Sequence, residues 1–232
     1  MKTSFWTRLL DIISPRTCAI CGERLSANER LICSSCHLHL PVTRYELSPS
    51  DNPMVRLFWG QFPVERAAAW FFYEPKTDTS QLIYDLKYRN HPEIGEALGA
   101  IIAQRFAEAC FFDSIDALVP MPITRRRKWQ RGYNQSMEIA RGVASVCSLS
   151  ILRKAVRRIR FSESQTTKHA RERLRNVEDA FLLSDADAIS GKHLLLIDDI
   201  VTTGATVIAC ARELAKAPGV KISILSAGIT RS

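Results

Sequence analysis

Residues 194–206 read LLLIDDIVTTGAT and join a short apolar run to two adjacent acids and a loop of small residues. The run Leu194–Ile197 is typical of a parallel strand that is covered on both faces of its sheet. Asp198 and Asp199 follow at its carboxyl end, which is where open α/β sheets bind their ligands. This order of strand, acid pair and loop predicts a ligand site at one edge of a parallel sheet.

The loop after the acids lies at the start of a helix, because apolar residues continue from Val207 to Leu214 with helical spacing. Backbone N–H groups and the helix dipole favour an anion at such a helix start. Carboxylates beside a phosphate-binding loop suit a phosphorylated sugar, whose hydroxyls bind the acids while its phosphate binds the loop. The alternative interpretation is a buried strand that ends in a polar turn and binds no ligand.

The same stretch resembles the motif with which type I phosphoribosyltransferases bind 5-phosphoribosyl-1-pyrophosphate (PRPP). The resemblance implies that Asp198 and Asp199 are the catalytic pair, which holds the ribose hydroxyls or metal-bound waters. It implies Mg²⁺ as the cofactor that accompanies PRPP. The residues expected to bind the 5-phosphate of PRPP are Val201, Thr202, Thr203, Gly204, Ala205 and Thr206.

Length, composition and charge restrict the class of protein. A chain of 232 residues is long enough for one α/β domain with a small additional module, and 46% hydrophobic residues argue against disorder. No apolar run approaches the roughly 20 residues that span a bilayer, and the start does not resemble a signal peptide. We therefore expect a cytoplasmic protein without a transmembrane segment. Residues 121–180 hold 15 Lys and Arg against 5 Asp and Glu, which points to an anionic ligand.

Two C-x-x-C pairs near the start of the chain predict a structural metal site. Cys18 and Cys21 form the first pair, and Cys33 and Cys36 form the second after 11 intervening residues. Four thiolates complete a closed tetrahedral shell, which is typical of structural zinc. The alternative is a redox-active pair like that of thioredoxin, but two pairs so close together, without a βαβ pattern around them, favour zinc.

Other metal-binding side chains occur near these pairs and further along the chain. His37 and His39 are candidate substitutes for a cysteine ligand, but four cysteines already fill the shell, so we interpret both as surface or packing residues. Cys110, Cys147 and Cys210 fall among apolar helical residues and are predicted to lie in the core. A module this small has little core of its own, so its folding should depend on the metal.

The rest of the chain alternates strand and helix patterns. Strands are expected at 67–73, 117–121, 151–156, 177–183, 194–197 and 222–229. Helices are expected at about 78–88, 92–106, 137–144 and 207–214, and a basic loop is expected at 123–133. The alternation predicts an α/β fold with a mostly parallel, doubly wound sheet of the type I phosphoribosyltransferase kind and a small N-terminal zinc ribbon.

The expected domains follow from these patterns. Residues 1–45 form the zinc-ribbon region with a short N-terminal helix, and the turn-rich residues 46–66 form a linker. Residues 67–232 form the phosphoribosyltransferase-like domain.

In the phosphoribosyltransferases that the chain resembles, the loop after the first core strand holds the leaving pyrophosphate. A second, mobile loop lies between the next two strands. The residues that the resemblance assigns to these loops are Arg131 and Gly132 within 125–135, and Lys168 and Arg171 within 161–176. The alternative for each of these cations is a solvated, charged surface.

Several motifs in a fixed order make the chain resemble the ComF family. After the cysteine pairs come KYR at 87–89, RGYNQ at 131–135 and QTTKHARERLRNV at 165–177, followed by the stretch quoted first. The resemblance covers essentially the whole chain. It implies an N-terminal zinc ribbon, a phosphoribosyltransferase-like domain and, as in some members, a role in DNA uptake by naturally competent bacteria.

Two functions remain open at this point. The favoured one is an accessory protein for single-stranded DNA uptake that binds PRPP and works with the uptake machinery. Its candidate nucleic-acid contacts are Arg126, Arg127 and Trp129, which combine charge with a stacking surface. The alternative is an active, Mg²⁺-dependent phosphoribosyltransferase that transfers ribose 5-phosphate to a nitrogen acceptor. Acceptor specificity would then come from a hood within residues 40–115.

Overall fold

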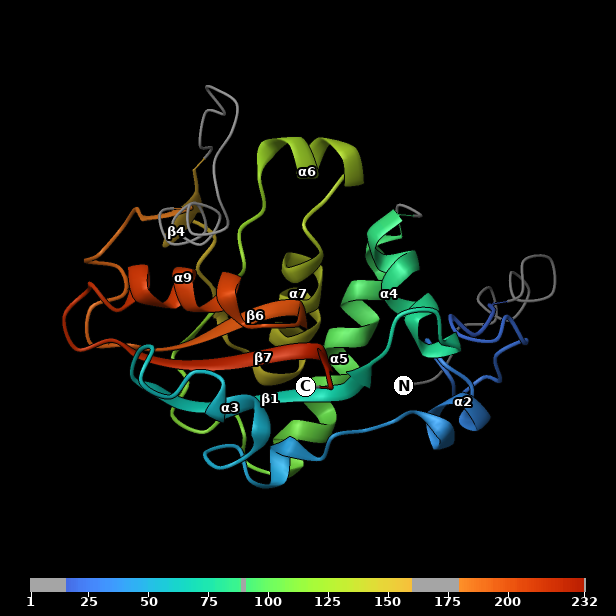
Figure 1. Ribbon diagram of the computed structural model, residues 1–232. Helices are drawn as coiled ribbons and strands as arrows, with labels where there is room; N and C mark the ends of the chain where they lie inside the picture. The colour runs from blue at the N-terminus through green and yellow to red at the C-terminus, as the bar shows by residue number, and fades with distance from the viewer. Residues whose placement is uncertain (1–15, 89–90, 160–179, 232) are drawn as a thin grey trace, which may run out of the picture.

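The computed structural model describes residues 16–88, 91–159 and 180–231 of the chain. A central sheet of five strands runs through this part of the molecule, with helices on both of its faces (Figure 1). Across the sheet the strands are β1 (Val64–Tyr73), β7 (Lys221–Thr230), β6 (His193–Val201), β2 (Ala117–Pro120) and β3 (Ser150–Ile151). All neighbouring strands in this sheet are parallel. The predicted α/β fold with a mostly parallel sheet is confirmed.

All four helices expected between residues 78 and 214 are present in the structure. The helices that the structure describes are α2 (Ser34–His39), the 3-10 helix η1 (Tyr45–Leu47), α3 (Pro53–Arg56), α4 (Asp78–Tyr88), α5 (Pro92–Glu108), α6 (Arg125–Arg131), α7 (Gln135–Cys147) and α9 (Ala205–Leu214). Within the described ranges, no helix has both the length and the hydrophobicity that a membrane crossing requires.

Strand β6 contributes side chains to both hydrophobic cores, one on each face of the sheet. Leu195 and Ile197 pack on the face covered by α4, α5 and α7, whereas Leu194 and Leu196 pack on the face covered by α3 and α9. Successive side chains of a strand point to opposite faces, so an uninterrupted apolar run is buried on both sides. This arrangement leaves the carboxyl end of β6 as the place where polar side chains can reach a ligand.

Helices α5 and α7 approach each other so closely that their backbones touch. A Cβ atom added to Gly142 would lie 2.0 Å from the carbonyl oxygen of Glu96, and one added to Gly99 would lie 2.1 Å from that of Ile139. Both distances are far below any van der Waals contact, so only glycine fits at these two positions.

Two expected elements differ from the structure. Residues 151–156 are not one strand, because β3 ends at Ile151 and a turn leads to β4 (Val156–Arg158), which pairs antiparallel with β5 (Phe181–Leu183). The expected basic loop at 123–133 contains the helix α6. The Thr124 side chain accepts a hydrogen bond from the backbone N–H of Arg127 and caps this helix, and arginine and lysine favour helical backbone.

The prediction that three further cysteines lie in the core is right for Cys210, which is buried, and wrong for Cys110, which is exposed. Helix α5 ends at Glu108, and Cys110 lies in the turn that follows, with a positive φ of 55°. Cys147, the last residue of α7, is half-buried.

The segment expected as a linker, residues 46–66, contributes side chains to the core. Asn52 caps α3 and donates a hydrogen bond to the carbonyl oxygen of Ala67 on β1. Met54, Val55 and Phe58 are buried against the α9 face of the sheet. The division of the chain into domains at these bounds stays a prediction.

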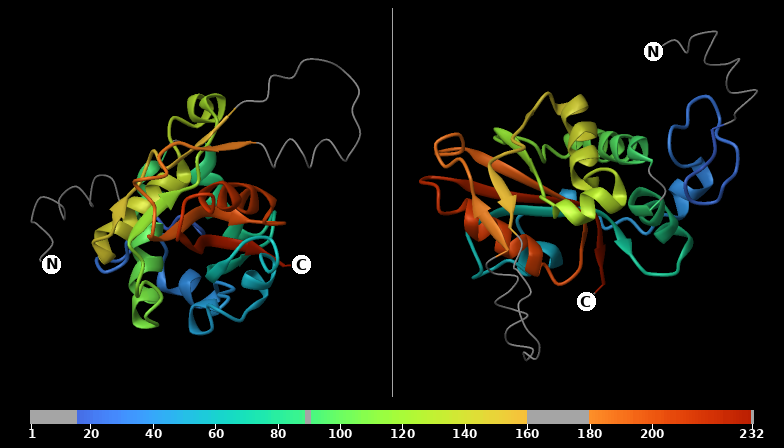
Figure 2. Two further views of the ribbon diagram at one scale, coloured as in Figure 1. Left: turned by 90° about the vertical axis from the view of Figure 1, so that its left-hand side faces the viewer. Right: turned by 90° about the horizontal axis from the view of Figure 1, so that it is seen from above.

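Residues 16–40, here called the cysteine module, pack beside α4 at the other side of the molecule from α9 (Figure 2). Leu25, Leu31 and Ile32 of the module belong to the same hydrophobic core as Trp70 of β1. The ring of His37 also lies 6.2 Å from that of Trp70. The expected short N-terminal helix lies outside the described residues.

Candidate functional site

Two acids and a lysine meet near the carboxyl end of β6. Asp198 and Asp199 lie inside this strand, which extends two residues further. The Ser136 hydroxyl and the backbone N–H of Asp199 donate hydrogen bonds to one carboxylate oxygen of Asp198, at 3.1 and 2.9 Å. The Lys87 ammonium forms an ion pair with Asp199 at 3.0 Å. The predicted acid pair is therefore surrounded by donors from α4 and α7.

The roles of Lys87 and Ser136 were not found by sequence reasoning. Lys87 belongs to the KYR motif, which served only for the family resemblance, and Arg89 of that motif lies outside the described residues. Ser136 follows RGYNQ in the first turn of α7. The fixed order in which both motifs precede the quoted stretch was the available signal.

Burial and charge perturb the protonation of Asp198. Burial raises the pKa of this carboxyl, and the negative charge of Asp199 raises it further. The hydrogen bonds from Asp199 and Ser136 and the charge of Lys87 lower it, and the result is a pKa of about 7 instead of 3.8. At neutral pH the carboxyl of Asp198 is therefore protonated in a substantial share of the molecules.

This pKa gives the first testable prediction. Because the folded chain holds the Asp198 proton more tightly than the unfolded chain, the free energy of unfolding should fall as the pH rises from about 4 to about 7. Asp198→Asn cannot ionise, so the variant should gain stability relative to the natural protein over this window. Urea unfolding at about pH 5 and about pH 8 measures the difference, with the exposed Asp113→Asn as control. A variant-to-natural difference that does not change with pH would contradict the assignment.

The predicted phosphate loop forms a turn at the amino end of α9. Gly204 is the residue before this helix and has a positive φ of 76°. Thr202 and Thr203 are exposed, and the loop with Asp198 and Ile200 encloses a small pocket of about 40 Å³. Such a turn at a helix start presents backbone N–H groups to an anion.

The buried ring of Phe58 lies next to Gly204 in this loop. A Cβ atom on Gly204 would lie 2.9 Å from Cε1 of Phe58, which is fully buried. Phe58 comes from the segment expected as a linker, so sequence reasoning did not connect it with the site. Its apolar neighbours Met54 and Val55 were the only local signal that this segment is packed.

The RGYNQ motif ties α6 and α7 to the end of α4. The Tyr133 hydroxyl donates a hydrogen bond of 2.6 Å to the carbonyl oxygen of Leu86. The Arg131 guanidinium lies 5.7 Å from the ring of Tyr88 and donates a hydrogen bond of 2.8 Å to Gln135. Gly132 ends α6 with a positive φ of 77°. The residues expected to hold pyrophosphate are thus next to the lysine that contacts Asp199.

The other cations expected at the site are not among the described residues. Lys168 and Arg171, with the whole expected mobile loop at 161–176, lie outside the described residues. Arg158 on β4 is a further cation near enough to the site to be influenced by its charge. Burial and the charge of Arg127 lower its pKa, and the charge of Asp198 opposes this change.

The candidate nucleic-acid contacts lie on α6, which stands away from the sheet at the edge where β6 ends (Figure 1). Arg126 and Arg127 are exposed, and Trp129 is 87% exposed. Because the Trp129 indole is so exposed, it does not contribute to the hydrophobic core. Helix α6 therefore offers an aromatic stacking surface among positive charges.

Four sulfur atoms gather in the cysteine module. The Sγ atoms of Cys18, Cys21, Cys33 and Cys36 all lie within 4.8 Å of one another, and those of Cys21 and Cys33 are 3.7 Å apart. A tetrahedral zinc site with bonds of about 2.3 Å has sulfur atoms about 3.8 Å apart, so this cluster fits a metal ion. The exposed His37 and His39 are not part of the cluster.

Hydrogen bonds from backbone N–H groups stabilise the thiolate form of Cys18. Burial raises the pKa of Cys18, but hydrogen bonds from backbone N–H groups, including those of Cys33 and Ile20, lower it to about 7. A thiolate is the form that binds metal.

Comparisons with known proteins agree with this geometry. A model of the phosphoribosyl transferase domain matches residues 86–227. The DNA utilization protein YhgH of Escherichia coli is 30% identical over 205 residues, which cover 85% of this chain and 83% of YhgH. Competence protein F of Haemophilus influenzae is 26% identical over 141 residues, 59% of this chain and 62% of that protein. Competence protein ComFC of Bacillus subtilis is 25% identical over 223 residues, 96% of this chain and 81% of ComFC.

Proposed function

This chain belongs to the ComF family of proteins with a phosphoribosyl transferase domain, and on that basis we propose that it binds PRPP together with Mg²⁺. The observation that carries the proposal is the acid pair on β6 directly before a glycine-capped loop at the start of α9. Carboxylates and a phosphate-binding turn at one sheet edge match the two ends of a phosphorylated sugar.

Each part of the site has a role in this proposal. The 5-phosphate binds the backbone N–H groups and hydroxyls of Thr202–Thr206, and the ribose hydroxyls bind Asp198 and Asp199. Mg²⁺ supplies charge neutralisation for the diphosphate. Lys87, which contacts Asp199, and Arg131, whose guanidinium lies 5.7 Å from the ring of Tyr88, add positive charge where the diphosphate extends from the ribose.

We propose zinc as the metal of the cysteine module. Four cysteines without an open ligand position suit a structural ion, and thiolates select zinc over magnesium or calcium.

A second prediction tests the PRPP site. Asp199→Asn should weaken binding of Mg²⁺ and PRPP about 10-fold or more, because an acceptor-only carboxylate becomes an amide that presents an N–H donor. Gly204→Val should weaken it as well, because a branched side chain at positive φ would meet the buried ring of Phe58. Titration calorimetry measures both affinities.

The control for this test is Thr79→Ala, a substitution at the opposite end of α4 from Lys87. Its PRPP affinity should equal that of the natural protein. Unchanged affinity in both Asp199→Asn and Gly204→Val would rule out the assignment.

Helix α6 favours a second function, binding of single-stranded DNA in the context of DNA uptake. Six consecutive exposed residues, 125–130, include three arginines, a lysine and Trp129. Cations neutralise backbone phosphates and release counterions, while an exposed indole stacks on a base. The competence proteins among the relatives support this context.

A third prediction follows for DNA. Affinity for a labelled single-stranded oligonucleotide should fall steeply with salt, and Arg126→Glu with Arg127→Glu should reduce that salt slope. Trp129→Ala should lose roughly 1–3 kcal/mol of binding free energy. Fluorescence anisotropy in a salt series measures these effects. The control, Lys216→Glu with Lys221→Glu, makes the same charge change away from α6 and should bind more tightly than the α6 variant. Absence of binding at low salt, or equal binding by both charge variants, would contradict a role for α6.

A further inference from the structure

We propose that PRPP releases single-stranded DNA from this protein, because the diphosphate of PRPP and the DNA strand compete for Arg131. The inference rests on the proposed PRPP site and on the proposed DNA surface of α6, and it adds the regulation of the second by the first. It also assigns two further DNA contacts on α4, Tyr84 and Tyr88, here called the tyrosine pair.

The tyrosine pair is an exposed aromatic surface on one face of α4. Tyr84 and Tyr88 are four residues apart, a spacing that places side chains next to each other on a helix. Their ring centroids are 5.0 Å apart with an angle of 42° between the rings, and the residues are 51% and 64% exposed. Single-stranded nucleic acids stack their bases on exposed aromatic rings of this kind, with little regard to sequence.

Cations next to the tyrosine pair favour a strand that carries phosphates over an uncharged partner. The guanidinium of Arg131 lies 5.7 Å from the ring centroid of Tyr88. Arg131 is the last residue of α6, whose residues 125–130 are all exposed and include Trp129. A single strand therefore meets aromatic surfaces on α4 and on α6, with positive charge where the two helices approach each other.

The ends of these two helices are fixed to each other. Tyr133, two residues after Arg131, is buried, and its hydroxyl donates a hydrogen bond of 2.6 Å to the carbonyl oxygen of Leu86 in the last turn of α4. The aromatic surfaces of α4 and α6 are thus preorganised, which lowers the entropy cost of binding one strand to both.

Arg131 also lies next to the position proposed for the diphosphate. Lys87, which directly precedes Tyr88 in the chain, forms an ion pair with Asp199 at 3.0 Å. The guanidinium of Arg131 is near the ring of Tyr88, so it lies one residue along α4 from the cation that reaches the acid pair.

A second series of contacts joins Arg131 to the acid pair through α7. The guanidinium donates a hydrogen bond of 2.8 Å to the side chain of Gln135. The next residue, Ser136, donates a hydrogen bond of 3.1 Å to Asp198. Arg131 is therefore connected to the two acids through two different helices.

A diphosphate and a DNA phosphate oppose each other at this arginine. A guanidinium binds phosphate oxygens in pairs through its planar fork of N–H donors. A diphosphate that occupies the fork leaves fewer donors for the strand, and its negative charges repel the phosphates of the strand at short range. PRPP should therefore weaken DNA binding, and DNA should weaken PRPP binding by the same factor.

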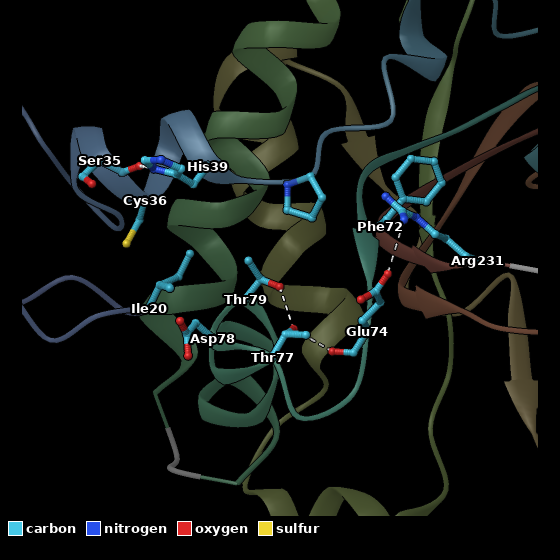
Figure 3. Close-up of a pocket in the computed structure, with 11 residues that line it drawn as sticks. Ile20, Ser35, Cys36, His39, Phe72, Glu74, Thr77, Asp78, Thr79 and Arg231 are labelled. Atoms are coloured by element: carbon cyan, nitrogen blue, oxygen red, sulfur yellow. Dashed lines mark hydrogen bonds and ion pairs between the residues drawn. The ribbon is translucent and has the colours of Figure 1, made fainter.

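The start of α4 is unsuited to the strand. Asp78 and Glu74 line a cavity of about 490 Å³ there, and Arg231 in the same cavity forms an ion pair with Glu74 at 3.6 Å (Figure 3). The two acids repel phosphates, whereas the other end of α4 carries Lys87. The strand is therefore confined to the end of α4 that lies next to α6.

Fluorescence anisotropy of a labelled oligothymidine in the presence of Mg²⁺ tests the competition. Saturating PRPP should weaken binding of the oligonucleotide about 10-fold, which lies within the usual range of coupling between two sites. Ribose 5-phosphate at the same ionic strength should change it by less than about 2-fold, because this ligand fills the phosphate loop without a diphosphate.

Variants then locate the competition at Arg131. With each variant saturated according to its own PRPP affinity from titration calorimetry, Arg131→Gln should reduce the effect of PRPP to less than about 2-fold. The matched control is Arg153→Gln, at an exposed arginine between β3 and β4, which should keep the full effect.

The tyrosine pair has a test of its own in the same assay. Tyr84→Ala should weaken oligonucleotide binding about 5-fold or more, because a stacked base loses its ring. Tyr84→Phe keeps the ring and should bind as the natural protein does. Equal binding by these two variants would overturn the assignment of the tyrosine pair.

Separate affinities for PRPP and DNA show which proposal an adverse result affects. The competition is wrong, and the two binding functions stand, if both ligands bind but PRPP leaves DNA binding unchanged. The same holds if ribose 5-phosphate weakens DNA binding as much as PRPP does, or if Arg131→Gln keeps the full effect. If PRPP or DNA does not bind to the natural protein, the proposed function itself fails, and the competition fails with it.

Discussion

Replacing Cys33 by serine should release the zinc ion that we propose for the cysteine module and unfold that module. Thiolate coordination contributes on the order of 10 kcal/mol in small zinc domains, and serine does not replace a thiolate. Leu31 and Ile32 share one hydrophobic core with Trp70, so their exposure should also loosen the second half of β1. Elemental analysis of the purified variant, followed by limited proteolysis, should show loss of one metal ion per chain and new cleavage before residue 45.

The matched control is Cys110→Ser, because Cys110 is exposed and far along the chain from the four clustered cysteines. This variant should keep its metal and its resistance to protease. A Cys33→Ser protein with full metal content would disprove the coordination, and loss of metal from Cys110→Ser would show that the cluster is not the site. The parallel sheet should remain folded in both variants, because both of its faces are covered by other helices.

Replacing Gly142 by alanine should cost about 3 kcal/mol of the free energy of unfolding, near the upper end of the usual range for overpacking. The new methyl group would meet two backbone atoms of α5, the oxygen of Glu96 at 2.0 Å and the nitrogen of Ala100 at 2.6 Å. A backbone cannot move aside as a flexible side chain can, so α5 and α7 must separate. This loss outweighs the roughly 1 kcal/mol by which alanine favours a helix over glycine.

Urea unfolding at neutral pH measures the effect of Gly142→Ala, and Ser145→Ala, an exposed position on the same helix, is the control. The control should change stability by no more than about 0.5 kcal/mol. Equal stability of Gly142→Ala and the natural protein would mean that the two helices do not touch through their backbones.

Local patterns in the sequence identified the parts of the site that lie close together along the chain. The acid pair and the glycine before α9 lie within seven residues of chain, and the four cysteines lie within 19 residues as two C-x-x-C pairs, where spacing alone implies shared geometry. The same reasoning placed β6 and β7 in a parallel sheet. Their long apolar runs are required by burial on both faces.

Contacts between distant segments could not be predicted in the same way. Lys87 reaches Asp199 across more than a hundred residues, and Phe58 supports Gly204 across an even larger separation. Periodicity reveals which face of an element is buried but not which side chain of another element it meets. Helix α6 was missed for a different reason, since a run of exposed basic residues has no apolar face for periodicity to detect.

The pairing of β1 with β7 has a consequence for how this protein folds while the ribosome synthesises it. Val64, the first residue of β1, pairs with Ile222, which is synthesised 158 residues later. Until then β1 cannot form its final pairing. At 5–20 residues per second this delay is roughly 8 to 30 s. During that time Trp70 and Phe71, fully buried in the finished protein, lack their final neighbour strand. We therefore expect nascent chains stalled before β7 to depend on chaperones and to aggregate when released.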